Sequence, residues 1–240
     1  MSIIYAHRGA SGHAPENTLE AFALAMEMGT DGFELDVHLS SDGELVVIHD
    51  EKVDRTTNGT GYVKDLPLAQ LKALDASNGM EKYKGAKIPS LAEVYALIKD
   101  TDIVVNVEVK TDGILYPDIE AKCLKLEREM GMTGRILYSS FNHYTIAELR
   151  RQDPDAKLAL LYMSGLYQPW NYAKMVGADF IHPYFPSMFL PGLPEGCAAS
   201  GIGCNLWTVD DPEIMKQCLA LNLGIITDYP DVAVALRDGK

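Results

Sequence analysis

Short apolar runs alternate with segments of helical period along the whole chain. This order is typical of repeated strand and helix units that share one parallel sheet. Eight such units in 240 residues predict an α/β fold, a (β/α)8 TIM barrel, which typically takes about 250 residues. The predicted strands are residues 3–7, 32–37, 103–110, 136–141, 158–162, 180–183, 203–209 and 224–227.

Several predicted helices begin with recognisable capping residues. Asn17 precedes the first helical pattern and is a plausible N-cap. Ser90 is followed three residues later by Glu93, the spacing of a capping box. Asp211 stands directly before a proline, which suits the first position of a helix. These signals predict where three of the helices start.

A hairpin interrupts the alternation after the second predicted strand. Residues 37–50 consist of an arm, a turn at 40–43 and a returning apolar arm at 45–49. With the turn centred there, opposed residue numbers sum to about 83 to 85. The hairpin therefore places His49 opposite residues 34–36.

A longer interruption follows the hairpin. Residues 51–89 contain scattered glycine, asparagine and lysine, with one short helical stretch near 66–74. Connections in compact domains are usually about 4 to 6 residues long, so a segment of this length favours a functional cap over a plain loop. We therefore expect one TIM-barrel domain over residues 1–240, with 51–89 as a small insertion.

The composition is that of an ordinary soluble globule. Hydrophobic residues make up 47% of the chain, and the mean hydropathy is -0.05. No apolar run approaches the roughly 20 residues that span a bilayer, and the N-terminus lacks a basic region and a cleavage site. We expect a cytoplasmic protein without stable membrane insertion. The four cysteines show no C-x-x-C pair and are expected to be buried thiols.

The charge balance is strongly acidic. A formal net charge of -13 and a pI near 4.8 repel nucleic acid and anionic membranes over most of the surface. An anionic ligand would need a local reversal of that field, and a hard cation held by carboxylates provides one.

Acidic residues gather at the ends of the second and third predicted strands. Glu34 and Asp36 are two residues apart, so they share one strand face, and Glu108 and Lys110 do the same on the next strand. Solvated surface carboxylates are the ordinary interpretation of such a pair. Apolar residues at the alternate positions argue instead that the acids face inward, where one divalent cation would compensate them. An all-oxygen set favours Mg²⁺ or Ca²⁺ over zinc.

Two histidines and an arginine are expected at the same rim. His7 ends the first predicted strand, and the hairpin register brings His49 beside the acids. Two histidines next to a metal can act as general acid and general base near neutral pH. Arg8 suits a phosphoryl or carboxylate oxygen, although a salt bridge at the rim explains it equally well.

A series of motifs in this order resembles the glycerophosphodiester phosphodiesterase family over essentially the whole chain. The motifs are His7-Arg8-Gly9-Ala10-Ser11, Pro15-Glu16-Asn17-Thr18, Glu34-Leu35-Asp36-Val37, His49-Asp50, Asp54-Arg55-Thr56-Thr57-Asn58-Gly59-Thr60-Gly61, Ile88-Pro89-Ser90-Leu91, Asn106-Val107-Glu108-Val109-Lys110, Ser140-Phe141, Trp207-Thr208-Val209 and Thr227-Asp228.

The resemblance implies a role for each candidate residue. Metal ligands would be Glu34, Asp36 and Glu108, and the acid and base pair would be His7 and His49. Phosphate or substrate contacts would come from Arg8, Lys110, Trp207, Phe141 and Asn17. For Phe141 a place in the core is as good an interpretation, and Asn17 would cap the first helix, line the site, or do both.

The function implied by the resemblance is metal-dependent hydrolysis of a small-molecule glycerophosphodiester, such as glycerophosphocholine, to glycerol 3-phosphate and an alcohol through a cyclic phosphate. One alternative is a lysophospholipase D-type activity on single-chain lipids, with an apolar groove at Met188, Phe189, Leu190 and Leu193. Another is a non-catalytic barrel that binds a phosphorylated ligand. The head group, the choice of ion, the oligomeric state and the assignment of the two histidines stay open at this level.

Overall fold

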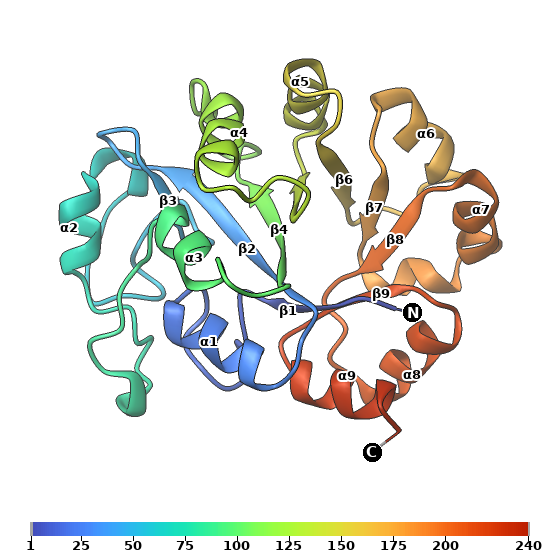
Figure 1. The fold of residues 1–240 in the computed structure, drawn as a ribbon, viewed down its shortest axis with the longest axis horizontal. Helices are drawn as coiled ribbons and strands as arrows, with labels where there is room; N and C mark the ends of the chain where they lie inside the picture. Colours follow the sequence, from blue (N-terminus) through green and yellow to red (C-terminus); the bar gives the residue numbers. More distant parts are fainter. Residues whose placement is uncertain (1, 240) are drawn as a thin grey trace.

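The computed structural model describes residues 2–239, and in this part of the chain eight parallel strands close into a barrel (Figure 1). The sheet order is β1-β9-β8-β7-β6-β5-β4-β2, and β1 also pairs with β2, which closes the barrel. The predicted (β/α)8 fold is confirmed. The barrel strands are β1 (Ile4–His7), β2 (Gly32–Leu39), β4 (Val104–Val109), β5 (Ile136–Ser140), β6 (Lys157–Tyr162), β7 (Phe180–Pro183), β8 (Gly203–Leu206) and β9 (Gly224–Thr227).

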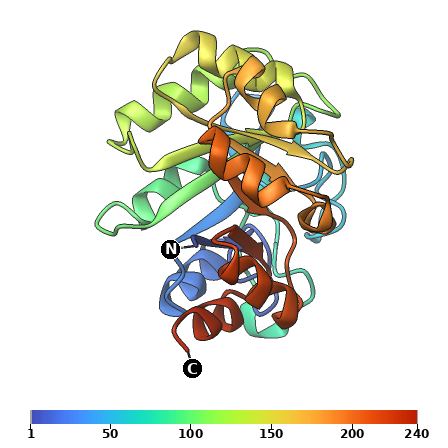
Figure 2. The same ribbon diagram turned by 90° about the vertical axis from the view of Figure 1, so that its right-hand side faces the viewer.

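Helices surround the strands on the outside of the barrel (Figure 1). The turned view in Figure 2 shows that the first helix (blue) and the last helix (red) lie side by side. An ion pair between Arg237 and Asp31 joins the same two regions. The helices are α1 (Leu19–Glu27), α2 (Leu68–Ala73), α3 (Leu91–Leu97), α4 (Ile119–Glu129), α5 (His143–Gln152), α6 (Pro169–Val176), α7 (Leu193–Ser200), α8 (Pro212–Ala220) and α9 (Pro230–Arg237), with 3-10 turns at Val63–Asp65, Glu81–Tyr83 and Phe185–Phe189.

The predicted hairpin is present with the predicted register. Strand β3 (Leu45–Val47) pairs antiparallel with β2, and Val37 lies opposite Val47. Beyond the last pair, the Ile48 amide donates to the Asp36 carbonyl at 3.1 Å, so the pairing continues toward the acidic residues. The returning arm therefore brings His49 beside the carboxyl end of β2, as the spacing predicts.

The insertion between β3 and α3 has a small hydrophobic core of its own. Buried side chains of β3 and its continuation pack against Val53, Val63, Leu71 and Ile88 of the 51–89 segment. The helical stretch expected near 66–74 is α2. The segment is thus fixed to the same hairpin that carries His49.

One capping prediction is wrong. Helix α1 is capped by Thr18, whose Oγ1 accepts from the Ala21 amide at 3.2 Å, and not by Asn17. Asn17 has a left-handed backbone, with φ 56°, and its side chain turns toward β2 instead. The capping box of Ser90 and the cap at Asp211 are confirmed.

The loop between β1 and α1 packs tightly on the helix. Gly9 has φ 80°, and a Cβ there would lie 2.7 Å from Ala21 atoms, so a side chain does not fit. This close approach brings the end of the loop, with Asn17, over the barrel mouth.

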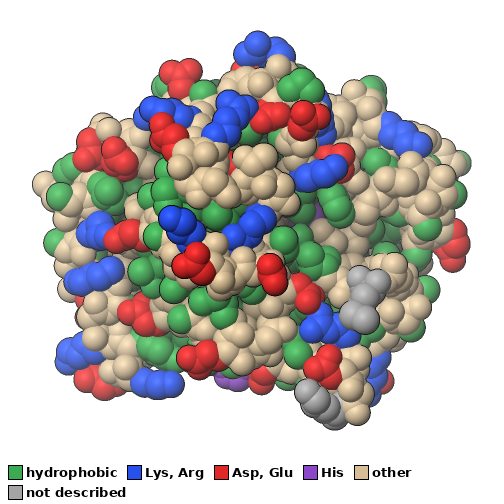
Figure 3. Space-filling model, viewed as in Figure 1, with side chains coloured by type: hydrophobic (Ala, Val, Ile, Leu, Met, Phe, Trp, Pro, Cys, Tyr) green, Lys and Arg blue, Asp and Glu red, His purple; other side chains and the backbone are tan. Residues whose placement is uncertain are grey.

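The surface carries both charge signs. On the face shown in Figure 3, acidic and basic side chains are interspersed, so the net charge of -13 does not gather there in one patch. The four cysteines are buried free thiols, as expected. Within residues 2–239, no helix combines the length and apolar character that crossing a membrane requires.

Candidate active site

Three buried carboxylates meet at the carboxyl ends of neighbouring strands. Glu34 and Asp36 lie on β2 and Glu108 lies on β4, with Asp36 and Glu108 paired in register. One oxygen from each carboxylate lies within 4.8 Å of the others. Because side chains alternate along a strand, the apolar residues between them face the helices and the acids face the barrel interior. The convergence expected from the sequence is therefore present.

The electrostatics of this acidic triad (Glu34, Asp36 and Glu108) favour binding of a cation. Burial, reinforced by the neighbouring carboxylates Asp36 and Glu108, raises the pKa of Glu34 well above its usual range. Burial also raises the pKa of Glu108 to about 7, although Lys110 partly opposes this. Within residues 2–239, the Asp36 Oδ1 atom is buried without a hydrogen-bond donor. A buried acceptor without a hydrogen-bond donor, among three convergent carboxylates, fits a hard cation such as Mg²⁺ or Ca²⁺.

Two basic side chains lie against the triad. The Arg8 Nε atom is 3.5 Å from Asp36 Oδ2, and the Lys110 Nζ atom is 2.8 Å from Glu108 Oε1 and 3.8 Å from Asp36 Oδ1. Burial alone would raise the pKa of Asp36, but the nearby charges of Arg8, His49 and Lys110 outweigh it and lower that pKa. Arg8 has φ 56°, and its amide donates to Glu34 Oε2 at 3.1 Å. A strained arginine held in this way indicates a functional position.

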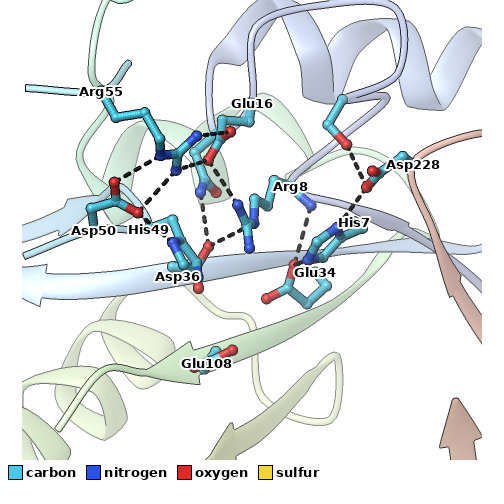
Figure 4. Close-up of polar contacts among 12 residues, drawn as sticks. His7, Arg8, Glu16, Glu34, Asp36, His49, Asp50, Arg55, Glu108 and Asp228 are labelled. Carbon is cyan, nitrogen blue, oxygen red and sulfur yellow. Dashed lines mark hydrogen bonds and ion pairs between the residues drawn. The ribbon is translucent and has the colours of Figure 1, made fainter. Parts of the chain in front are cut away.

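The two histidines are oriented in the same manner. His7 Nδ1 lies 2.6 Å from Asp228 Oδ1, and His49 Nδ1 lies 2.6 Å from Asp50 Oδ1 (Figure 4). An ionised carboxylate only accepts, so Nδ1 carries a proton in both rings and Nε2 remains for chemistry. The Nε2 atom of His7 lies 3.9 Å from Glu34 Oε2. Both histidines therefore have Nε2 available for chemistry, and both line the cavity at the acidic triad.

A cavity of about 50 Å³ opens beside the triad. Phe141 and Trp207 form one wall and meet edge to face, with ring centroids 5.4 Å apart. The Trp207 indole is fixed by a hydrogen bond of 2.7 Å from Nε1 to the His182 carbonyl. Phe141 thus lines the cavity, whereas the sequence was equally compatible with a place for Phe141 in the core. The lining residues are His7, Arg8, Glu34, His49, Asn106, Glu108, Phe141, Leu161, Trp207 and Ile226.

The remaining predicted site residues, Lys110 and Asn17, contact carboxylates of the triad. Lys110 bonds Glu108, as described above, and Asn17 Nδ2 donates to Asp36 Oδ2 at 2.9 Å. Of the two places considered for Asn17, the structure supports the one in the site. All ten predicted residues come together at one end of the barrel.

Sequence reasoning missed several polar residues of this site. Asn106 lines the cavity, and both atoms of its buried amide lack a partner within residues 2–239. Asp50 and Asp228 orient the histidines, and Glu16 bonds Arg8 Nη1 at 2.9 Å. All four belong to the motifs quoted above. Their place in these motifs is the sequence signal that could have identified them. The residues that they contact are visible only in the folded chain.

Residues 7–232 match the model of the glycerophosphoryl diester phosphodiesterase family. The chain belongs to this family. A glycerophosphodiester phosphodiesterase of Caldanaerobacter subterraneus is 46% identical over 237 residues, which cover 98% of this chain and 97% of that protein. One from Bacillus altitudinis is 39% identical and aligns over 99% of both chains.

Solved structures with the same fold agree with this family assignment. A glycerophosphodiester phosphodiesterase from Agrobacterium tumefaciens superposes with a TM-score of 0.85 at 32% identity, covering 98% of this chain and 100% of that one. A phosphodiesterase from Oleispira antarctica, solved in complex with the product sn-glycerol-3-phosphate, gives a TM-score of 0.87 at 27% identity, covering 99% and 97%. The predicted enzyme class, a glycerophosphodiester phosphodiesterase, is confirmed.

Proposed function

We propose that this family member hydrolyses small glycerophosphodiesters, such as glycerophosphocholine, to glycerol 3-phosphate and an alcohol, with one divalent cation as cofactor. The observation that carries this proposal is the pair of histidines, each held through Nδ1 by a carboxylate, that line one cavity beside the buried acidic triad. The relative from Oleispira antarctica that holds sn-glycerol-3-phosphate supports the identity of the product.

Glu34, Asp36 and Glu108 would hold Mg²⁺ or Ca²⁺ through carboxylate oxygens. When bound, the ion supplies charge neutralisation for the phosphoryl oxygens and lowers the pKa of a hydroxyl that it contacts. Arg8 and Lys110 flank the triad at the distances given above, so their charges would bind the remaining phosphoryl oxygens. Without these cations, the negative triad would repel an anionic substrate.

The two histidines would move the protons. One Nε2 accepts the proton of the glycerol hydroxyl next to the phosphate-bearing carbon, and that oxygen attacks phosphorus. The bond from phosphorus to the alcohol oxygen breaks, and the protonated Nε2 of the other histidine donates to the departing oxygen. Water then opens the cyclic phosphate with the roles reversed. Intramolecular attack has the entropic advantage of a held nucleophile.

The cavity wall would bind the carbon skeleton of the substrate. Phe141 and Trp207 offer aromatic surface to the CH₂ groups, and the unpartnered amide of Asn106 offers one donor and one acceptor to a glycerol hydroxyl. We expect this amide to favour glycerol over alcohols that lack the hydroxyl.

A second apolar cavity favours a lysophospholipase D-type activity as the alternative. Its volume is about 580 Å³, and Leu190 and Leu193 of the predicted groove are among its lining residues. Phe189, which precedes Leu190 in the chain, is exposed, whereas Met188 is buried in the core. A single acyl chain would suit such walls, so lysophospholipids belong in any substrate panel.

The test is product release from a panel of glycerophosphodiesters and lysophospholipids, first with chelator and then with Mg²⁺ or Ca²⁺ added back. We expect turnover of glycerophosphodiesters with an added ion and none with chelator. Glu108→Gln should lose most of the rate, while Glu213→Gln, which changes an exposed carboxylate on α8, serves as the matched control. Failure to turn over any glycerophosphodiester with either ion would refute the proposal.

A second arm tests the cyclic route. A substrate whose attacking hydroxyl is removed or methylated should bind but react poorly. Hydrolysis of that analogue at nearly the rate of glycerophosphocholine would refute the cyclic intermediate.

A further inference from the structure

The insertion contributes one residue, Arg55, that binds two carboxylates next to active-site residues. Arg55 donates from Nη1 and Nη2 to Glu16 at 2.6 and 2.8 Å, and from Nε and Nη2 to Asp50 at 2.7 and 2.9 Å (Figure 4). One guanidinium thus binds two carboxylates at once, each through two hydrogen bonds. The two carboxylates come from separate segments, the loop after β1 and the end of the hairpin.

Each of these carboxylates also holds a residue of the site. Glu16 Oε1 accepts from Arg8 Nη1 at 2.9 Å, and Asp50 Oδ1 accepts from His49 Nδ1 at 2.6 Å. A continuous series of hydrogen bonds therefore runs from His49 through Asp50, Arg55 and Glu16 to Arg8. Figure 4 shows this series lying along one side of the acidic triad.

We propose that Arg55 is a positioning residue, which fixes the His49 ring and the Arg8 guanidinium relative to each other and ties the insertion to the chemistry. This inference rests on the proposed function, because it assigns those two residues their roles.

The geometry separates this residue from an ordinary surface ion pair. Exposed pairs contribute about 0–1 kcal/mol and need no function. Here the Glu16 side chain is only 14% exposed. In each carboxylate, the oxygen that accepts from Arg55 Nη2 also accepts from an active-site group, Arg8 on Glu16 and His49 on Asp50. Hydrogen bonds from Arg55 lower the pKa of Asp50 to about 2, so Asp50 stays ionised and accepts from His49 Nδ1. A lysine lacks the planar fork that spans two carboxylates.

The other histidine does not depend on Arg55. Asp228, which orients His7, also accepts from Ser11 Oγ at 2.8 Å, a residue of the loop after β1. The insertion therefore supports one half of the acid and base pair. This asymmetry distinguishes a positioning role from a general contribution to folding.

The experiment compares kcat and KM for glycerophosphocholine, with saturating ion, in Arg55→Ala and Arg55→Lys. Arg128→Ala is the control, because Arg128, on α4, makes an exposed ion pair with Asp153 and neither residue belongs to the candidate site. Loss of an orienting partner typically costs about 10- to 100-fold, so we expect a kcat decrease of that size in Arg55→Ala. Arg55→Lys should recover only part of it, and the control should match the parent enzyme. Ion affinity should not change, because Arg55 does not touch the triad.

The decisive readout is the pair of double variants. Because Arg55 is proposed to fix His49 relative to Arg8, its effect requires the His49 ring. Arg55→Ala should therefore cost less than threefold further in the His49→Ala background, yet keep most of its effect in the His7→Ala background. Equal losses in both backgrounds, or a kcat within twofold of the parent in Arg55→Ala, would overturn the proposal. If the parent enzyme itself turns over no glycerophosphodiester, the proposed function has failed. The positioning by Arg55 is then tested separately: the Tm shifts of Arg55→Ala and Glu16→Gln should be non-additive, and additive shifts would overturn it.

Discussion

Replacing Glu34 by glutamine should stabilise the protein without metal while removing its response to metal. Glu34 is buried beside two other carboxylates, and its raised pKa reports how unfavourable its negative charge is there. Glutamine keeps the shape of the side chain and removes that charge. The variant therefore separates the electrostatic cost of the triad from its packing.

The size of the effect follows from the separation of the carboxylates. Two unit charges no more than 4.8 Å apart repel by about 3.5 kcal/mol or more at an effective dielectric constant of 20. Arg8 attracts Glu34 and offsets part of this repulsion. We expect a net gain of about 1 to 2 kcal/mol in the unfolding free energy of the metal-free protein, or about 2–8 °C in Tm for a chain of this size.

The assay is thermal unfolding at pH 8, with chelator and with a series of Mg²⁺ or Ca²⁺ concentrations. The parent protein should gain about 2.7 kcal/mol when the ion reaches 100 times its Kd, and Glu34→Gln should gain far less. Glu213→Gln controls for the loss of a carboxylate at an exposed position. A lower Tm than the parent in chelator, or an undiminished metal shift, would refute the electrostatic reasoning.

Three further predictions concern catalysis, selectivity and pH. His7→Ala and His49→Ala should each lower kcat by about 10²- to 10⁴-fold with unchanged circular dichroism, since general acid or base help has that size; turnover near the parent rate would return the histidine concerned to a structural role. Asn106→Leu should narrow the rate ratio between a glycerol diester and its analogue lacking the terminal hydroxyl by about 10-fold or more, as a lost hydrogen bond of 1–3 kcal/mol implies; an unchanged ratio would exclude the amide contact. Burial lowers the pKa of His182 to about 3, so below about pH 6.5 the unfolded chain binds a proton that the folded chain does not. The unfolding free energy should therefore decrease as the pH is lowered, by up to about 1.4 kcal/mol per pH unit. Urea unfolding of His182→Gln between pH 7.5 and 5 should show a correspondingly smaller slope, and equal slopes would contradict the assignment.

Local pattern was enough to predict the barrel and the acidic triad. Alternation with a period of two puts Glu34 and Asp36 on one strand face, and parallel neighbours bring the carboxyl ends of their strands to the same edge. The hairpin register also follows from the position of its turn, which is how His49 was placed beside the acids. These inferences succeed because strand geometry converts spacing along the chain directly into direction in space.

The tertiary structure alone decided the partners of the site residues. Asp228 reaches His7 from 221 residues away because it follows β9, which pairs with β1 in the barrel. Asn17 leaves its expected capping position because the packed loop turns it toward Asp36. Arg55 meets two carboxylates only because the insertion folds back over the loop after β1. Such contacts depend on side-chain packing between segments distant in sequence, and no local period encodes them.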